Sequence, residues 1–184
     1  MEGTILYFDT PGKVNTVSTL EAVRRRAGEL GIREVVLATT HGYTVKKAAE
    51  LFKGTDIRLV AVSICASFDE EGWTMSGGER EELRKLGITV VTGMHSLGDD
   101  VSESFTESAP NRVVRETLYR FCQGMKVAVE VAIMAAEAGA IGVAEEVIAV
   151  GGTNEGADTA IVLKPSYARK FSDIRIREII AKPR

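Results

Sequence analysis

The segment 39–44 (Thr-Thr-His-Gly-Tyr-Thr) has the residue types of a phosphate-binding loop. It follows an apolar run and leads into a helical pattern, and a helix N-terminus attracts anions through its free N–H groups and partial positive charge. Threonine hydroxyls add donors, and glycine allows a positive φ and a close backbone approach. We predict that phosphate is bound by Thr39, Thr40, His41, Gly42, Tyr43 and Thr44. The alternative is an N-cap at Thr44 after a tight turn.

Three further loops rich in glycine and hydroxylated residues, at 63–67, 92–96 and 151–158, follow other strand-like runs. In an open α/β sheet the carboxyl ends of parallel strands share one edge, and ligands bind there. The rest of the ligand is therefore predicted to contact Ser63, Gly93, His95, Gly151, Gly152, Thr153 and Asp158. Alternatively, the glycine pair only turns a hairpin and Asp158 caps the following turn.

Two residues are candidates for proton transfer. His95 follows a predicted strand, and imidazole titrates near neutral pH. Glu130 interrupts an apolar helix face, where burying a carboxylate is costly unless it is paired, and Lys126 one turn earlier is a structural partner for it. Trp73 could cover a planar ligand or simply pack. No catalytic residue follows from the sequence, so whether the protein is an enzyme stays open.

Alternating strand and helix patterns predict the elements that position these loops. After a short apolar run at 5–8, strands are expected at 34–38, 57–64, 88–91, 146–150, 159–163 and 174–180. Helices are expected from Asn15 or Thr16 to a stop at Gly31, and at 44–52, 79–86 and 112–138, the last bent at Gly124. The strand at 159–163 forms a hairpin with its predecessor, and the alternation at 174–180 suits an edge strand. The polar segment 98–110 is expected to be a surface excursion or a flap.

These patterns predict one domain over residues 1–184. Its fold class is α/β, with three layers, a mostly parallel open sheet flanked by helices, and an antiparallel hairpin at the edge. The hydrophobic fraction of 45% and the net charge of −3 are ordinary for a globular protein and give no basic stripe for nucleic acid. The longest apolar stretch, 127–136, is too short to span a membrane. With two cysteines, two histidines, no metal motif and no signal pattern, we expect a cytoplasmic protein without metal, membrane or nucleic-acid partners.

The stretches 38–44, 129–139, 146–153, 156–160 and 178–184, together with the order of the elements, resemble the C-terminal domain of pyruvate kinase. The chain is similar above all to free-standing pyruvate kinase C-terminal-domain-like proteins of archaea and bacteria. It is too short to hold the catalytic barrel of a pyruvate kinase, so the resemblance does not imply kinase activity.

The resemblance implies a ligand for the predicted cleft, flavin mononucleotide (FMN), but no reaction. Segment 39–44 would hold the phosphate, while Ser63, His95 and residues 151–153 would line the ribityl chain and ring. Thr39, Gly42 and Thr44 also match the phosphate loop of flavodoxins. The first hypothesis is an FMN-binding protein, with a redox reaction left undefined. The alternative is a regulatory module that binds a sugar phosphate or another nucleotide without catalysis. A third is a purely structural role as a homo-oligomer.

Overall fold

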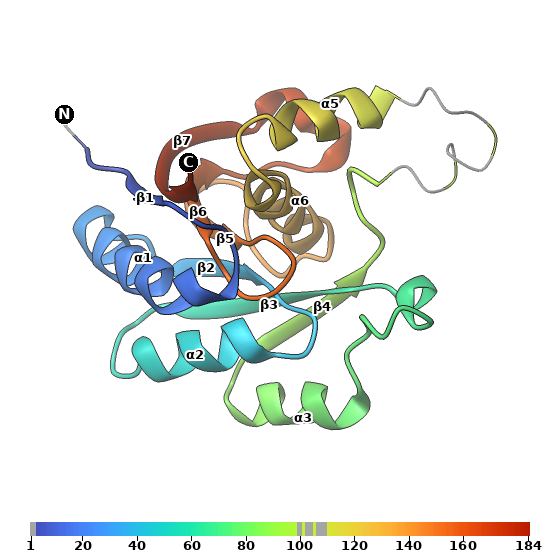
Figure 1. The fold of residues 1–184 in the computed structure, drawn as a ribbon. Coiled ribbons are helices and arrows are strands. Elements are labelled where there is room, and N and C mark those ends of the chain that lie inside the picture. Colours follow the sequence, from blue (N-terminus) through green and yellow to red (C-terminus); the bar gives the residue numbers. More distant parts are fainter. Residues whose placement is uncertain (1–2, 99–100, 102–104, 106–109) are drawn as a thin grey trace.

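A seven-stranded sheet forms the centre of the protein in this computed structural model, which describes residues 3–98, 101, 105 and 110–184 (Figure 1). The strand order is β1-β7-β6-β5-β2-β3-β4. The strands are β1 (Leu6–Phe8), β2 (Glu34–Ala38), β3 (Arg58–Ile64), β4 (Thr89–Gly93), β5 (Val147–Gly151), β6 (Thr159–Lys164) and β7 (Arg175–Pro183). Only β6 runs antiparallel to its neighbours, so the mostly parallel α/β sheet predicted from the sequence is confirmed.

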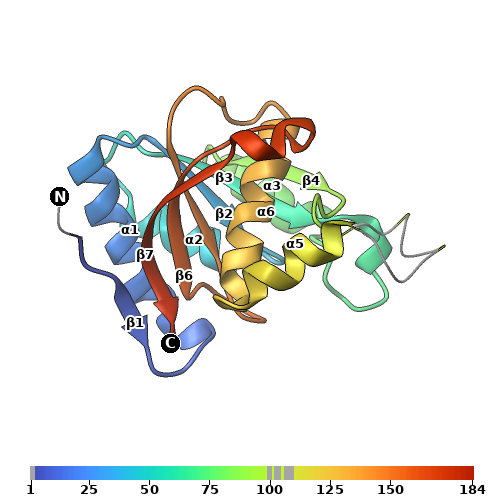
Figure 2. The ribbon, with the colours of Figure 1, turned by 90° about the horizontal axis from the view of Figure 1, so that it is seen from above.

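Helices cover both faces of this sheet. One face carries α1 (Thr16–Leu30), α2 (Tyr43–Leu51) and α3 (Gly77–Lys85), and the other carries α5 (Pro110–Tyr119) and α6 (Gln123–Glu137) (Figure 1). Figure 2 shows α6 lying along the sheet with α5 beside it. In the described part of the chain, three short 3₁₀ helices lie in the connections: η1 (Lys13–Asn15), η2 (Ala66–Phe68) and η3 (Ala168–Asp173). No helix in the described residues is long and apolar enough to cross a membrane.

The central strands are apolar on both sides because each side is covered. In β2, Val35 and Leu37 join the core beneath α1, α2 and α3, whereas Val36 joins the core beneath α6. Successive side chains of a strand point to opposite faces, so a strand buried on both faces reads as a continuous apolar run. Burying each such side chain stabilises the fold by about 1.5–3 kcal/mol.

Helix α1 ends where the sequence predicts. Gly31 adopts the left-handed conformation (φ 69°), and the chain leaves the helix there. The start at Thr16 also agrees, but the expected side-chain cap is not formed. The side-chain amide of Asn15 instead donates to the carbonyl of Thr10, at 2.6 Å, and so fixes the turn before the helix.

The expected position of the hairpin within the sheet is wrong. Strands β5 and β6 pair antiparallel as predicted, but they lie in the interior of the sheet. The strand predicted at the edge is β7, which lies between β6 and β1, and β1 is the edge strand instead. Ile176 is 43% exposed whereas Ile180 is buried. An alternating pattern marks a strand with one uncovered face, and an interior strand that is covered over only part of its length shows the same pattern.

The single helix predicted at 112–138 is also wrong, since α5 ends at Tyr119 and α6 begins at Gln123. The break is at Cys122, whose backbone is extended (φ 174°, ψ 168°). Gly124 lies inside α6, where a Cβ would overlap the side chain of Thr159 on β6. This glycine therefore permits close helix–sheet packing rather than a bend. Most of segment 98–110, expected to be an excursion or a flap, lies outside the described residues.

Candidate functional site

A cleft of about 400 Å³ lies at the carboxyl edge of the sheet. The chain leaves β2 through α2 to β3 and β4 and returns through α6 to β5, which pairs with β2. Strands β2 and β5 thus flank the point where the strand order reverses, which is the usual ligand position in such folds. The predicted residues that line the cleft are Thr39, Thr40, His41, Tyr43, Thr44, Ser63, His95, Glu130 and Gly152.

Segment 39–44 forms a closed turn before α2. The N–H of Gly42 donates to the hydroxyl of Thr39 at 2.9 Å, and the N–H of Thr39 donates to the carbonyl of Val62 at 3.0 Å. The first N–H groups of α2, those of Tyr43 and Thr44, have no acceptor within the described part of the chain, as expected at a helix N-terminus. These donors and the partial positive charge of the helix end therefore remain available to an anion.

Gly42 serves the turn rather than the lining. It precedes α2 with a φ of 85°, a conformation that glycine adopts without strain. A Cβ built on Gly42 would face the side chains of Leu83 and Lys46, each 3.5 Å away. The predicted positive φ is confirmed, and Gly42 itself lies outside the cleft lining.

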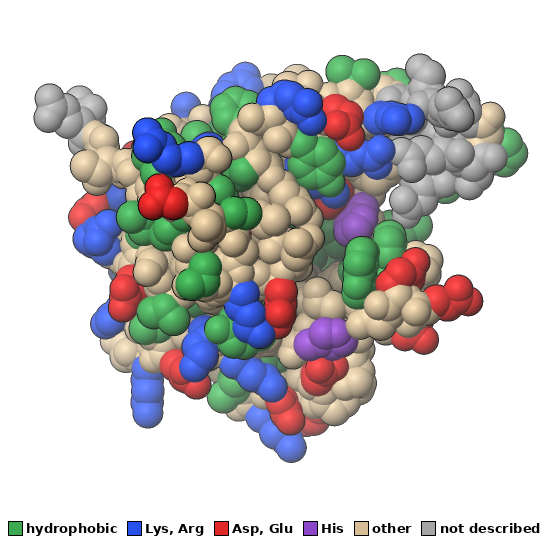
Figure 3. Space-filling view, viewed as in Figure 1, with side chains coloured by type: hydrophobic (Ala, Val, Ile, Leu, Met, Phe, Trp, Pro, Cys, Tyr) green, Lys and Arg blue, Asp and Glu red, His purple; other side chains and the backbone are tan. Residues whose placement is uncertain are grey.

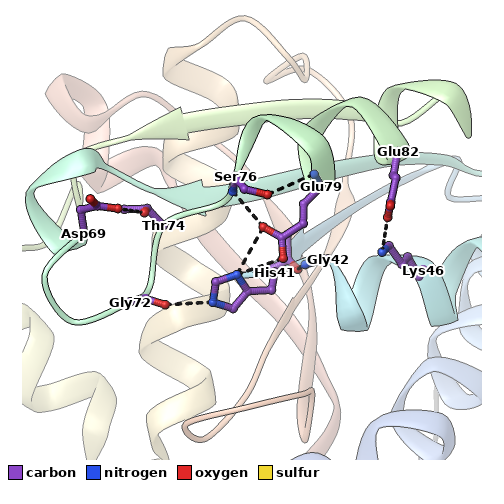
Figure 4. Close-up of polar contacts among 10 residues, drawn as sticks. His41, Gly42, Lys46, Asp69, Gly72, Thr74, Ser76, Glu79 and Glu82 are labelled. Carbon is purple, nitrogen blue, oxygen red and sulfur yellow. Dashed lines mark hydrogen bonds and ion pairs between the residues drawn. The ribbon is translucent and has the colours of Figure 1, made fainter.

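His41 links segment 39–44 to the loop that follows β3 (Figure 4). Its Nε2–H donates to the carbonyl of Gly72 at 2.9 Å, and its Nδ1 lies 3.2 Å from the Glu79 carboxylate. Both ring nitrogens face acceptors, so the imidazolium form satisfies both contacts and the neutral form only one. Glu79 also forms a capping box with Ser76 at the start of α3. The hydrogen bonds from Ser76, with a smaller contribution from His41, lower the pKa of Glu79.

Trp73, one of two stacked aromatic rings, forms part of one wall of the cleft. The centroids of Phe68 and Trp73 are 5.9 Å apart with an interplanar angle of 7°, and Phe68 also contacts His95, with centroids 5.3 Å apart. Trp73 lines the cleft and is 52% exposed. Figure 3 shows the two histidines on one face of the molecule with hydrophobic side chains between them. An exposed indole face provides a surface on which a planar ligand can stack.

The floor of the cleft carries a buried ion pair on α6. Lys126 and Glu130 are 5% and 2% exposed, and Lys126 Nζ lies 2.5 Å from Glu130 Oε2. The other carboxylate oxygen of Glu130 accepts the N–H of Leu97 at 2.9 Å, and His95 Nε2 lies 3.9 Å from Glu130 Oε2. Burial, and then the negative charge of Glu130, raises the pKa of Tyr119 at the same cleft. Glu130 is therefore paired with Lys126, as the structural interpretation expected, and it also lines the cleft.

Ser63 reaches the cleft from β3 within a chain of hydrogen bonds. Its hydroxyl lies 2.7 Å from that of Thr92, which also accepts from Arg80 Nη1 at 2.6 Å. Ser63 is 1% exposed, so these bonds fix its orientation. Gly93 is the last residue of β4 rather than a loop residue, and a Cβ there would face Met134. Gly93 lies outside the lining.

The other predicted ligand residues near β5 hold neighbouring segments of the chain together instead of facing the cleft. Asp158 is fully buried, and its carboxylate accepts from Gly12 N at 2.7 Å, Thr153 N at 3.2 Å and Thr159 Oγ1 at 2.7 Å. Gly151 lies against the backbone of α6, where a Cβ would overlap the carbonyl of Gly124. Gly151, Thr153 and Asp158 therefore lie outside the lining and hold the turn between β5 and β6 in place.

Several lining residues were not predicted as site residues. They are Tyr119, Gln123, Lys126, Asn154, Glu155 and Gly156, besides apolar side chains such as Val127 and Met134. Trp73, for which the sequence left ligand contact and packing open, also lines the cleft. The available signal for Lys126 was its spacing of four residues from Glu130 within an apolar helix. Among the described residues, no group of three or more His, Cys, Asp and Glu side chains could hold a metal ion.

Comparison with solved structures finds chains of low similarity. A pyruvate kinase from Cryptosporidium parvum has 11% sequence identity and a TM-score of 0.40, covering 82% of this chain and 22% of its own. The same enzyme in complex with ADP has 13% identity and a TM-score of 0.38, covering 88% and 23%. A competence-damaged protein (CinA) superfamily protein from Enterobacter cloacae has 14% identity and a TM-score of 0.30, covering 89% and 78%.

The present chain thus spans less than a quarter of the length of those pyruvate kinases. Comparison with family models gives a match that covers most of the chain in one segment. Residues 17–163 match the model described as pyruvate kinase, alpha/beta domain. This protein therefore belongs to the pyruvate kinase alpha/beta domain family.

Proposed function

We propose that the cleft binds a small phosphorylated ligand and that this ligand is FMN. One observation carries the proposal: the N-terminus of α2 and the exposed ring of Trp73 border the same cleft of about 400 Å³. The first suits a phosphate and the second a planar ring. The volume falls within the range of about 300–1,000 Å³ that is usual for small-molecule sites.

The phosphate end of the site is supported by the donors around α2. The N–H groups of Tyr43 and Thr44 have no acceptor among the described residues, and the hydroxyl-bearing residues Thr40 and Thr44 line the cleft. His41, also in the lining, adds positive charge when its ring is protonated. A dianionic phosphate matches this set, because it offers three acceptor oxygens to several converging donors.

The ring end of the site favours a flavin over a sugar. Trp73 is stacked on Phe68 and half exposed, so one face of the pair is available to a ligand ring. When bound, a flavin supplies reversible electron transfer. The contribution of this chain would be to bind the phosphate at α2, to orient the ring against Trp73 and to shield it from water.

The first experiment is a visible absorbance spectrum of the purified protein before and after soaking with FMN and desalting. Retained flavin bands support the proposal. Dissociation constants for FMN and riboflavin then locate the phosphate, because the two ligands differ only in that group. Thr40→Ala and Thr44→Val each remove one hydrogen bond to a charged group, worth about 1.5–3 kcal/mol, and should weaken FMN binding by about tenfold or more. Riboflavin binding should not change in either variant.

Two further variants complete this series. Gly42→Val should also weaken FMN binding, through strain at a φ of 85°. Lys47→Met is the control, since Lys47 pairs with Glu50 on α2 outside the cleft lining. Equal losses for FMN and riboflavin in Thr40→Ala and Thr44→Val would mean that the phosphate lies elsewhere.

A sugar phosphate is the second candidate, because Ser63, Lys126 and Glu130 give the cleft a polar floor that suits ligand hydroxyls. A protein that stays colourless after soaking with FMN would favour this regulatory role. A panel of sugar phosphates and nucleotides would then be screened by thermal shift. A ligand at one hundred times its dissociation constant stabilises the fold by about 2.7 kcal/mol, which such a screen detects.

A further inference from the structure

We propose that Lys126 forms an oxygen-binding subsite on the floor of the cleft. The subsite takes an uncharged oxygen, from a carbonyl or a hydroxyl, in the part of the ligand beyond its phosphate. The inference rests on the proposed function, because it assumes that a phosphorylated ligand enters from α2. It adds a second point of recognition, on the opposite face of the sheet from α2.

The incomplete hydrogen bonding of Lys126 carries the inference. This side chain is 5% exposed and borders the cleft. An ammonium group has three N–H donors, yet within the described residues Lys126 Nζ has one hydrogen-bond partner, Glu130 Oε2 at 2.5 Å. A buried charge is costly unless its donors are satisfied. An oxygen acceptor in the cleft would supply what the protein leaves unfilled.

Glu130 fixes the position and the charge of the subsite. Its Oε1 accepts the N–H of Leu97 at 2.9 Å, so the carboxylate is held from the segment after β4 as well as from its own helix. Its negative charge balances that of Lys126, and a balanced pair favours an uncharged oxygen over a second anion. The phosphate therefore belongs at α2, and the carbonyl or hydroxyl belongs at Lys126. His95 Nε2, 3.9 Å from Glu130 Oε2, borders the same floor.

The buried pair is not explained by the stability of α6. The remaining buried face of that helix is apolar and packs against the sheet. Replacing a buried ion pair by uncharged side chains of similar size is often neutral or stabilising, so such pairs are weak contributors to folding. An ion pair retained at the floor of a cleft is therefore better explained by binding.

The experiment compares two variants that differ only at Lys126. E130Q removes the counter-charge and keeps an oxygen for the N–H of Leu97, and K126M/E130Q also removes the ammonium. Dissociation constants are measured for FMN and riboflavin, with K47M as the control for loss of a paired lysine elsewhere. We expect K126M/E130Q to bind both flavins at least tenfold more weakly than E130Q, which corresponds to about 1.4 kcal/mol. Lumiflavin, which lacks the ribityl chain, separates a ring carbonyl from a ribityl hydroxyl.

The losses should be equal for FMN and riboflavin, because the subsite does not touch the phosphate. Equal affinities of E130Q and K126M/E130Q for riboflavin would overturn the inference. If the wild type binds neither flavin, the proposed FMN ligand fails, and urea unfolding without ligand decides the inference. A K126M/E130Q midpoint at or above that of the wild type would support a pair retained for another ligand. A lower midpoint would show that the pair serves the fold and would overturn the inference.

Discussion

Replacing Asp158 should destabilise the fold without removing any residue of the proposed FMN site. Its carboxylate is fully buried and accepts three hydrogen bonds, from the backbone of Gly12 and Thr153 and from the hydroxyl of Thr159. Gly12 is 146 residues away in sequence, so this one side chain ties the turn after β1 to the turn between β5 and β6.

The size of the effect follows from these bonds. A hydrogen bond to a charged group contributes about 1.5–3 kcal/mol, and contributions within one network add incompletely. Asp158→Ala leaves all three donors without their acceptor and should cost roughly 3–5 kcal/mol, a large part of the stability of a small domain. Asp158→Asn keeps one oxygen for the two backbone N–H groups and loses the charge, so it should cost about 1–2 kcal/mol.

Urea unfolding followed by circular dichroism measures both costs. Asp56→Asn serves as the control, because Asp56 is exposed and its one ion-pair partner among the described residues is the exposed Arg33, at 3.4 Å. That change should alter stability by less than about 0.5 kcal/mol. We expect Asp158→Asn to keep the affinity of the wild type for FMN. An Asp158→Asn protein with wild-type stability and no FMN binding would refute this reasoning and assign Asp158 to the ligand.

Three further predictions concern the loop after β3 with the start of α3, and the contact between α6 and β5. The pKa of Glu79 is lowered in the folded protein from 4.5, so its contribution is present above pH 4.5 and is lost as the pH falls through the folded value. Glu79→Gln should therefore cost about 1 kcal/mol near neutral pH and nothing in acid, as measured by urea unfolding at several pH values; a pH-independent difference would contradict this. His41→Gln should change the fluorescence of Trp73, the only tryptophan, as the loop loosens. Gly151→Ala should cost about 1–3 kcal/mol by overpacking against α6, whereas Gly78→Ala, with nothing within 4 Å of its Cβ position, should cost nothing.

Local patterns predicted the elements best. The run Val-Val-Leu marks the buried strand Glu34–Ala38, and Gly31 marks the end of α1, because each signal depends on neighbouring residues only. The order of the strands in the sheet was harder to predict from the sequence. Whether β7 lies at an edge depends on β1, a three-residue strand that pairs with it from the other end of the chain.

In the candidate site, too, the sequence predicted local features and missed contacts between distant segments. The sequence predicted the turn at 39–44 and the convergence of four loops, since the carboxyl ends of parallel strands must share an edge. It did not separate residues that face the cleft from residues that hold the loops. Asp158 and Gly151 have the residue types of ligand contacts, yet their partners are Gly12 and the backbone of α6, which only the folded chain brings near.

The sequence by itself determined the α/β class, the positive φ at Gly42 and the helix N-terminus that follows it, because periodicity and turn chemistry are local properties. Tertiary structure alone decided the walls of the cleft. It packed Phe68 against both Trp73 and His95, and it placed Lys126 and Glu130 on the floor. The physical reason is that a side chain's surroundings are set by contacts between distant segments, and these depend on how the helices pack on the sheet.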